Sequence, residues 1–394
     1  MEKQPGEQKE VFMSYLEHKN PHPRQTCCHI TKTNTKTHEI IRKNIEKSAM
    51  YSGLISGVGP RYCPSIEDKI MRFADKESHQ IFVEPEGLET NWIYPNGIST
   101  SLPPEVQQEY IRSIKGFEEA EIMQQGYAVE YDYIDPRNLN KNLRLKNTTN
   151  LFLAGQINGT TGYEEAGAQG VVAGINAAQH AKREQPWVPT RQNSYMGVLV
   201  DDLTRFGVSE PYRMFTSRAE HRLLLRQDNA DARLFTEAKS LGLINNERES
   251  AFLQKQQDKK TILASLKQTK TKLNNETKTA EELCKRNDVT ENEVKELITI
   301  KNKRFTEVYY DVRYSGYVNK QKRELAKMKN LEEHDLGLIF DYSEVVGLSG
   351  ELVEKLNNNK PKNLHDASLM EGITPAALNV LTIHLKKIDA IRAN

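Results

Sequence analysis

The chain has 394 residues, too many for one compact core, so two or three domains are expected. Its 55 lysines and arginines against 54 aspartates and glutamates leave a net charge of +1, so overall charge neither requires nor excludes a nucleic-acid partner. No apolar run reaches the length of a membrane span and residues 1–10 lack the apolar core of a signal peptide, so no membrane partner is expected. These features predict a cytoplasmic protein, or one of the mitochondrial matrix in a eukaryote.

Four cysteines are too few for a disulfide scaffold, and they lack the paired CxxC spacing of a zinc site. We therefore expect reduced thiols and no metal site.

Composition changes near residue 190. Residues 1–66 resemble a small strand–helix unit, but no GxGxxG turn, the usual opening of a dinucleotide-binding fold, precedes it. From residue 232 to 305 the apolar residues have helical spacing without strand-like alternation. Near the end, Thr374 and Pro375 predict a helix start, followed by a face of leucines and Ile388. The sequence thus predicts an α/β part followed by an all-α part.

Residues 151–178 carry the clearest motif. Residues 151–153 predict a buried strand, and a glycine-rich loop over 155–162 leads into a helix that opens with two glutamates. Amides at such a helix start can face an anionic ligand. The helix also carries a stripe of small residues, which we expect to pack against a sheet or a flat ring: Ala166, Gly170, Ala173 and Ala177. An ordinary strand–loop–helix crossover is the alternative.

Several longer motifs occur in a fixed order along the chain, at 59–69, 73–75, 84–87, 94–103, 126–133, 154–165 and 210–220. Together they resemble the MnmG/GidA family, the flavoprotein subunit of the tRNA uridine 5-carboxymethylaminomethyl modification enzyme. The similarity runs from about residue 12 to residue 388, while the family's FAD-binding N-terminal half has no counterpart, so we expect a fragment, a split gene product or a truncated chain.

The resemblance implies addition of a carboxymethylaminomethyl-type group at C5 of the tRNA wobble uridine, U34. Family members use FAD, NAD(P)H and methylenetetrahydrofolate as the one-carbon donor. They act as homodimers with an MnmE-type GTPase.

The resemblance also implies the fold. We expect part of a FAD/NAD(P)-binding Rossmann domain of the glutathione-reductase type, then a helical C-terminal domain. The expected divisions are a remnant of the inserted dinucleotide or substrate domain (1–66), the C-terminal half of the FAD domain (67–190), a helical domain (191–310) and a C-terminal bundle for tRNA or partner binding (311–394).

Cys63 matches a family cysteine proposed as the catalytic nucleophile. A thiolate that adds at C6 of uracil makes C5 nucleophilic, and the neighbouring Arg61 favours the thiolate. A small buried hydrophobe is the alternative. Gly59 and Arg61 lie in a stretch that the family assigns to nicotinamide binding.

The glycine-rich loop, called the cofactor loop below, matches the family's flavin-contacting loop. Amide side chains and backbone amides suit the flavin ring and pyrophosphate, although Asn158 and Thr160 could instead close the turn. The matching residues are Gly155, Gln156, Asn158, Gly159, Thr160, Thr161 and Gly162.

Arginines interleave with aromatic residues after position 210. Such forks suit phosphates and splayed RNA bases, and we expect RNA contact at Arg213, Arg218, Arg222 and Arg226. The alternative is pairing with nearby acidic residues. For the whole chain the alternatives are a truncated, non-catalytic tRNA- or partner-binding fragment and a general FAD/NAD oxidoreductase for small molecules.

Overall fold

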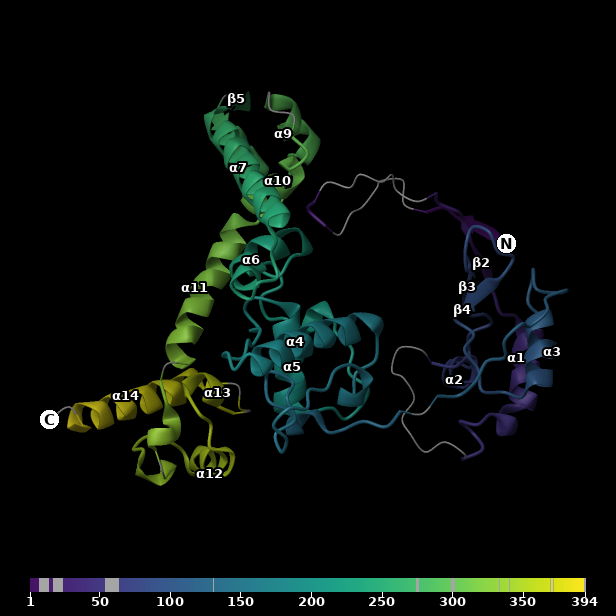
Figure 1. Ribbon diagram of the computed structural model, residues 1–394, viewed down its shortest axis with the longest axis horizontal. Coiled ribbons are helices and arrows are strands. Elements are labelled where there is room, and N and C mark those ends of the chain that lie inside the picture. Colours follow the sequence, from purple (N-terminus) through teal and green to yellow (C-terminus); the bar gives the residue numbers. More distant parts are fainter. Residues whose placement is uncertain are drawn as a thin grey trace. The chain divides into compact units, whose positions relative to one another are not determined.

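The computed structural model describes residues 1–6, 14–16, 24–53, 64–129, 131–273, 276–298, 302–332, 334–339, 341–368, 370 and 372–392 (Figure 1). The chain forms two compact units. The first unit comprises Met1–Glu220 with Ala230–Gln254, and the second comprises His221–Asn229 with Lys255–Asn394.

The first unit begins with a four-stranded antiparallel sheet of order β1-β2-β3-β4. Ile81 and Val83 alternate along β3 and are buried, because successive side chains of a strand point to opposite faces. Helices α1 and α3 lie side by side next to this sheet (Figure 1). The element bounds are β1 (Glu2–Gln4), β2 (Cys28–Lys32), α1 (Thr35–Lys43), α2 (Ile66–Arg72), β3 (Gln80–Pro85), β4 (Ile93–Asn96) and α3 (Pro104–Arg112).

One hydrophobic core joins the sheet to these helices and draws residues from both sides of position 66, including Ile41 and Ile70. The predicted domain divisions at residues 66, 190 and 310 stay predictions.

Two histidines make this core sensitive to pH. The buried His38 Nε2 lies 2.8 Å from Thr33 Oγ1, and the His38 and His79 rings are 5.3 Å apart. Burial lowers the pKa of both rings, with smaller contributions from Arg42 at His38 and from His38 itself at His79. The folded chain therefore binds fewer protons than the unfolded chain just below the ordinary histidine pKa of about 6.5.

We expect the free energy of unfolding to fall as the pH drops from 7 to 5. Each histidine contributes at most about 1.4 kcal/mol per pH unit to the slope of the free energy of unfolding against pH. Urea unfolding across this range checks the prediction, and the double variant His38→Gln/His79→Gln should show a flatter pH dependence. An unchanged slope in that variant would contradict it.

Helices α4 (Tyr163–Ala181) and α5 (Tyr195–Phe206) form the next part of the first unit, followed by α6 (Ala230–Ser240). Val172 of α4 and Val200 of α5 share a core with Leu139 and Leu143. In the predicted small-residue stripe Ala173 is buried, whereas Gly170 and Ala177 are exposed.

The strand predicted over 151–153 is wrong. Phe152 forms only an isolated bridge with Arg144, and Leu151 is 43% exposed. Three apolar residues in a row are too short a pattern to establish a buried strand.

The second unit is mainly helical, with a core that includes Ile262, Leu283 and Phe305. A hairpin of β5 (Lys270–Leu273) and β6 (Glu276–Thr279) interrupts the stretch predicted to be helical throughout. Alternating threonines, which favour strands, explain this exception. Helix α7 (Asn246–Gln268) begins in the first unit and ends in the second. The helices that follow it in the second unit are α8 (Ala280–Cys284), α9 (Glu291–Leu297), α10 (Phe305–Arg313) and α11 (Ser315–Glu332).

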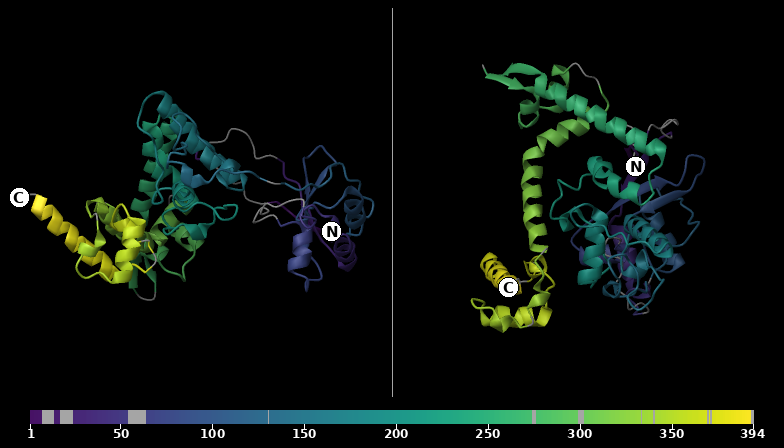
Figure 2. Two further views of the ribbon diagram at one scale, coloured as in Figure 1. Left: turned by 90° about the horizontal axis from the view of Figure 1, so that it is seen from below. Right: turned by 60° about the vertical axis from the view of Figure 1, so that its left-hand side comes forward.

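The C-terminal helices are α12 (Gly350–Asn359), α13 (Leu364–Ser368) and α14 (Pro375–Arg392). The predicted start of α14 is confirmed, since the Ala377 amide donates to Thr374 Oγ1 at 3.2 Å. Leu381 and Leu385 are buried in the core of this bundle, as predicted. Helix α13 lies beside both α11 and α14 (Figure 1). The yellow helix α14 lies at the C-terminal end in both views of Figure 2.

The predicted fold class, an α/β part followed by a helical C-terminal part, is confirmed. Within the described residues the larger sheet is antiparallel, so these residues alone do not form the parallel sheet typical of Rossmann domains.

Candidate functional site

Three glycines shape the cofactor loop. Gly155, Gly159 and Gly162 have φ angles of 88°, 75° and 123°, which disfavour residues with a side chain. A Cβ atom on Gly159 would lie 2.6 Å from Val208 Cγ2, and one on Gly162 would overlap the Glu165 carboxylate. Backbone geometry therefore favours glycine at all three positions, and at Gly159 the close Val208 side chain also leaves no space for a Cβ atom.

The side chain of Gln169, on α4, forms hydrogen bonds to the loop. Its Oε1 accepts from the Gly155 amide at 3.2 Å and from Asn158 Nδ2 at 2.7 Å. Its Nε2 donates to Thr160 Oγ1 at 2.9 Å and to the Glu165 carbonyl at 3.2 Å. Gln169 is fully buried. No sequence motif marks it, because its hydrogen-bond partners in the loop are brought close to it only by the fold.

The predicted ligand-contacting residues of the loop fall into two groups. Asn158 is 0% exposed and Thr160 is also buried. Asn158 Nδ2 donates to the Leu153 carbonyl just before the loop and Thr160 Oγ1 donates to the Gly155 carbonyl, which agrees with the alternative that they close the turn. Gln156 is exposed and Thr161 is half-buried. Within the described residues, Asn158 Oδ1 has no hydrogen-bond partner.

Backbone hydrogen bonds join the loop to the arginine-rich segment. The Tyr212 amide donates to the Gly159 carbonyl at 2.8 Å, and the Thr161 amide donates to the Tyr212 carbonyl at 2.9 Å. Two motifs that lie about fifty residues apart in the sequence are thus neighbours in the first unit.

Glu165 strengthens this junction. Its Oε1 accepts from the Met214 amide at 2.7 Å and lies 3.4 Å from Arg213 Nε. The residue is 3% exposed, and its Oε2 has no hydrogen-bond partner among the described residues. A buried carboxylate therefore lies in the first turn of α4 and ties this turn to the Met214 amide and the Arg213 side chain.

The four predicted RNA-binding arginines have different surroundings. Arg213 and Arg218 are half-buried in the first unit. Arg222 is exposed and belongs to the second unit, as does Arg226. Arg226 pairs with Asp228 at 2.9 Å and with Asp311. These contacts agree with the alternative to RNA binding, in which the arginine pairs with acidic residues of the same chain.

Asp202 of α5 organises a charged cluster beside the loop. It accepts from the Tyr212 hydroxyl at 2.7 Å and from Arg191, and Arg218 Nη1 lies 3.8 Å away. Burial, followed by the Asp202 charge, raises the pKa of Tyr212, so its hydroxyl stays protonated as a donor. Arg191 also pairs with Glu220 at 2.6 Å.

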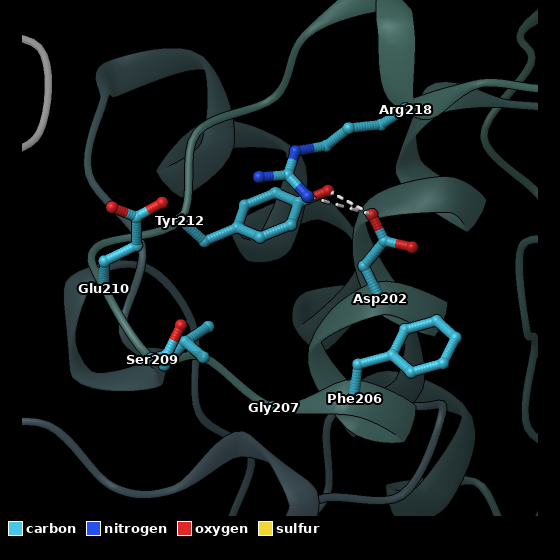
Figure 3. Close-up of a pocket in the computed structure, with 8 residues that line it drawn as sticks. Asp202, Phe206, Gly207, Ser209, Glu210, Tyr212 and Arg218 are labelled. Carbon is cyan, nitrogen blue, oxygen red and sulfur yellow. Dashed lines mark hydrogen bonds and ion pairs between the residues drawn. The ribbon is translucent and has the colours of Figure 1, made fainter. Parts of the chain in front are cut away.

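A pocket of about 400 Å³ opens next to this cluster (Figure 3). Its walls come from the end of α5 and from the segment that follows. The lining residues are Asp202, Phe206, Gly207, Val208, Ser209, Glu210, Tyr212 and Arg218.

Cys63, Gly59 and Arg61 lie outside the described residues, so their predicted roles stay predictions. Of the other thiols, Cys27 and Cys28 are half-buried and free, and burial raises the pKa of Cys284 to about 11. In the part of the chain that the structure describes, no three metal-ligating side chains gather into a candidate metal site. None of the described helices combines the length and the apolar character needed to cross a bilayer.

Two family models match the chain. "Glucose inhibited division protein A" matches residues 1–185, and "tRNA modifying enzyme MnmG/GidA C-terminal helical bundle" matches residues 324–393.

Solved structures of Aquifex aeolicus GidA are similar as well. The form II crystal structure has a TM-score of 0.76 and 43% identity over 92% of this chain and 59% of that chain. The form I structure has a TM-score of 0.76 and 45% identity over 92% of this chain and 60% of that chain. This chain thus spans about three fifths of the length of these proteins. The predicted family is confirmed: the chain belongs to the MnmG/GidA family.

Proposed function

We propose that this chain takes part in FAD-dependent modification of the tRNA wobble uridine, adding a carboxymethylaminomethyl-type group at C5 of U34. The observation that supports the proposal best is the pair of backbone hydrogen bonds between Tyr212 and the cofactor loop. These bonds place a glycine-rich loop suited to a flavin nucleotide next to an arginine-rich segment suited to RNA. Membership of the MnmG/GidA family supports it.

Two features of the cofactor loop support FAD binding. Positive φ angles at Gly155, Gly159 and Gly162 give it a backbone path that residues with side chains rarely adopt. It leads into the N-terminus of the 19-residue helix α4, whose first amides have no partner within the helix and suit a pyrophosphate.

In this proposal Gln156, Thr161 and Gly162 contact the cofactor, while Gly155, Asn158 and Thr160 keep the loop in shape. Bound FAD supplies the redox step, with NAD(P)H as reductant and methylenetetrahydrofolate as one-carbon donor. Gly59 and Arg61 contact the nicotinamide nucleotide. A homodimer and an MnmE-type GTPase partner complete the proposal.

Cys63 is the proposed nucleophile. Its thiolate forms a bond to C6 of uracil, and the electron pair of the C5–C6 double bond moves to C5 and O4. C5 then attacks the methylene carbon of methylenetetrahydrofolate, and one C–N bond to the folate breaks, its electron pair moving to the folate nitrogen, which takes up a proton. An amine, glycine or ammonium, then displaces the remaining folate nitrogen from this carbon. Loss of the C5 proton restores the double bond and expels the thiolate.

Arg213, Arg218 and Arg222 contact the tRNA. The ion pairs of Arg213 with Glu165 and of Arg218 with Asp202 are long, at 3.4 and 3.8 Å, whereas Arg226 pairs with Asp228 at 2.9 Å.

The test is mass spectrometry of tRNA nucleosides from cells that lack the gene and carry either the wild-type gene or a variant. Wild type should restore the modified wobble uridine. Cys63→Ser should lower its amount by at least about a hundredfold, because the nucleophile is lost. Cys27→Ser, which removes a half-buried free thiol, should behave as wild type.

Normal product with Cys63→Ser would contradict the nucleophile. Unchanged wobble uridines after loss of the gene would instead support the non-catalytic tRNA- or partner-binding alternative.

A further inference from the structure

The pocket beside Asp202 has no role in the function proposed above, although Arg218 lines it (Figure 3). We propose that it receives one splayed nucleobase of single-stranded RNA. This inference rests on the proposed function, since tRNA is the RNA concerned. A volume of about 400 Å³ lies within the range of small-ligand pockets, roughly 300–1,000 Å³.

The planar guanidinium group of Arg218 lines the pocket and is fixed by contacts within the chain. Its guanidinium carbon lies 4.2 Å from the centre of the Tyr212 ring, and its Nε donates to the Arg213 carbonyl at 2.9 Å. Tyr212 is in turn fixed by its bond to Asp202. Because the guanidinium plane is held by these contacts, stacking a base on it costs little side-chain entropy.

Phe206 provides an aromatic wall. It is 63% exposed at the end of α5, and the Arg205 guanidinium lies 5.4 Å from its ring centre. Gly207, with a φ of 70°, turns the chain after Phe206, and Ser209 and Glu210 line the opposite side of the pocket (Figure 3). The lining thus includes an apolar ring and polar side chains, which matches a base with its apolar faces and polar edge.

The charges around the pocket favour a base over a phosphate. Asp202 and Glu210 both line it and repel an anion bound inside. The Asp202 charge is offset by Arg191 and Arg218, and Arg213 lies on the adjoining segment, so cations for the RNA backbone flank the pocket. We therefore place the base inside the pocket and the phosphates outside it.

The experiment measures binding of the full chain to a fluorescein-labelled anticodon stem-loop RNA by anisotropy. Phe206→Ala should weaken binding about 5- to 30-fold, as expected for loss of one stacked base. Phe206→Tyr, which keeps the ring, should bind within about twofold of wild type. The control Trp92→Ala, which removes a half-exposed aromatic residue outside this pocket, should have no effect.

Abasic RNAs identify the base. Removing the base at one loop position should weaken binding to wild type as much as Phe206→Ala does, and should cost nothing further with Phe206→Ala protein. Tight binding by Phe206→Ala, or additive losses at every position, would overturn the nucleobase pocket and leave the proposed function standing. Failure of the wild-type chain to bind the stem-loop would overturn both.

Discussion

Replacing Gly197 with alanine should lower the free energy of unfolding by about 3 kcal/mol or more. Gly197 lies in the first turn of α5, where its amide donates to Ser194 Oγ at 3.0 Å. A Cβ atom there would overlap the Thr190 carbonyl group and lie 2.8 Å from the Arg191 amide nitrogen. These neighbours are backbone atoms, so no change of rotamer can relieve the clash.

The effect should extend to the Asp202 cluster. Helix α5 carries Asp201 and Asp202, and Arg191 bonds to both. Any shift that makes room for a methyl group at Gly197 also moves Arg191 relative to these buried carboxylates. Removing a partner from a buried ion pair is costly because the remaining charge is left desolvated.

Gly170→Ala is the matched control for this prediction. Gly170 lies within α4, and no atom lies within 4 Å of the position where its Cβ would stand. Alanine is favoured over glycine in a helix, so this change should raise the free energy of unfolding by about 0.5–1 kcal/mol. Urea unfolding of both variants checks the pair. A Gly197→Ala protein as stable as wild type would contradict the close approach of α5 to Thr190.

The sequence predicts best where a pattern is local. The cofactor loop is marked by three glycines that need unusual backbone angles, and the start of α14 is marked by Thr374 and Pro375. Both features depend on residues a few positions apart. The short apolar run at 151–153 is also local, but its burial depends on distant partners, and the strand predicted there does not form.

The candidate site could be predicted only as separate motifs. The sequence marks the loop and the arginine-rich segment, but nothing in it indicates that Tyr212 bonds to the loop backbone. Arg191 and Gln169 match no motif, because a lone arginine or glutamine is more often a surface residue. Their importance comes from long-range partners such as Glu220 and Asp202 for Arg191.

Gln169→Leu should lower the free energy of unfolding by about 2–4 kcal/mol. The substitution removes four hydrogen bonds and leaves the Gly155 amide and Asn158 Nδ2 without this acceptor in a buried place. Each unsatisfied buried group costs about 1–3 kcal/mol, although relaxation of the loop recovers part of this. Urea unfolding measures the loss, and hydrogen exchange should show that the Gly155 amide has lost protection. Gln179→Leu, on the same helix, removes only a 3.5 Å bond to the Gln185 carbonyl and should change stability by less than about 0.5 kcal/mol.

Gln169→Glu separates the accepting from the donating role of this side chain. A carboxylate keeps both accepted bonds but loses the donated bonds to Thr160 and the Glu165 carbonyl. Because burial favours the neutral acid, the folded variant should bind a proton more readily than the unfolded chain, and its deficit relative to wild type should shrink as the pH falls from 7 to 5. The protonated acid regains one donor, which restores part of the support for the loop. A deficit that stays constant over this range would contradict the raised pKa expected for an acid in this buried place.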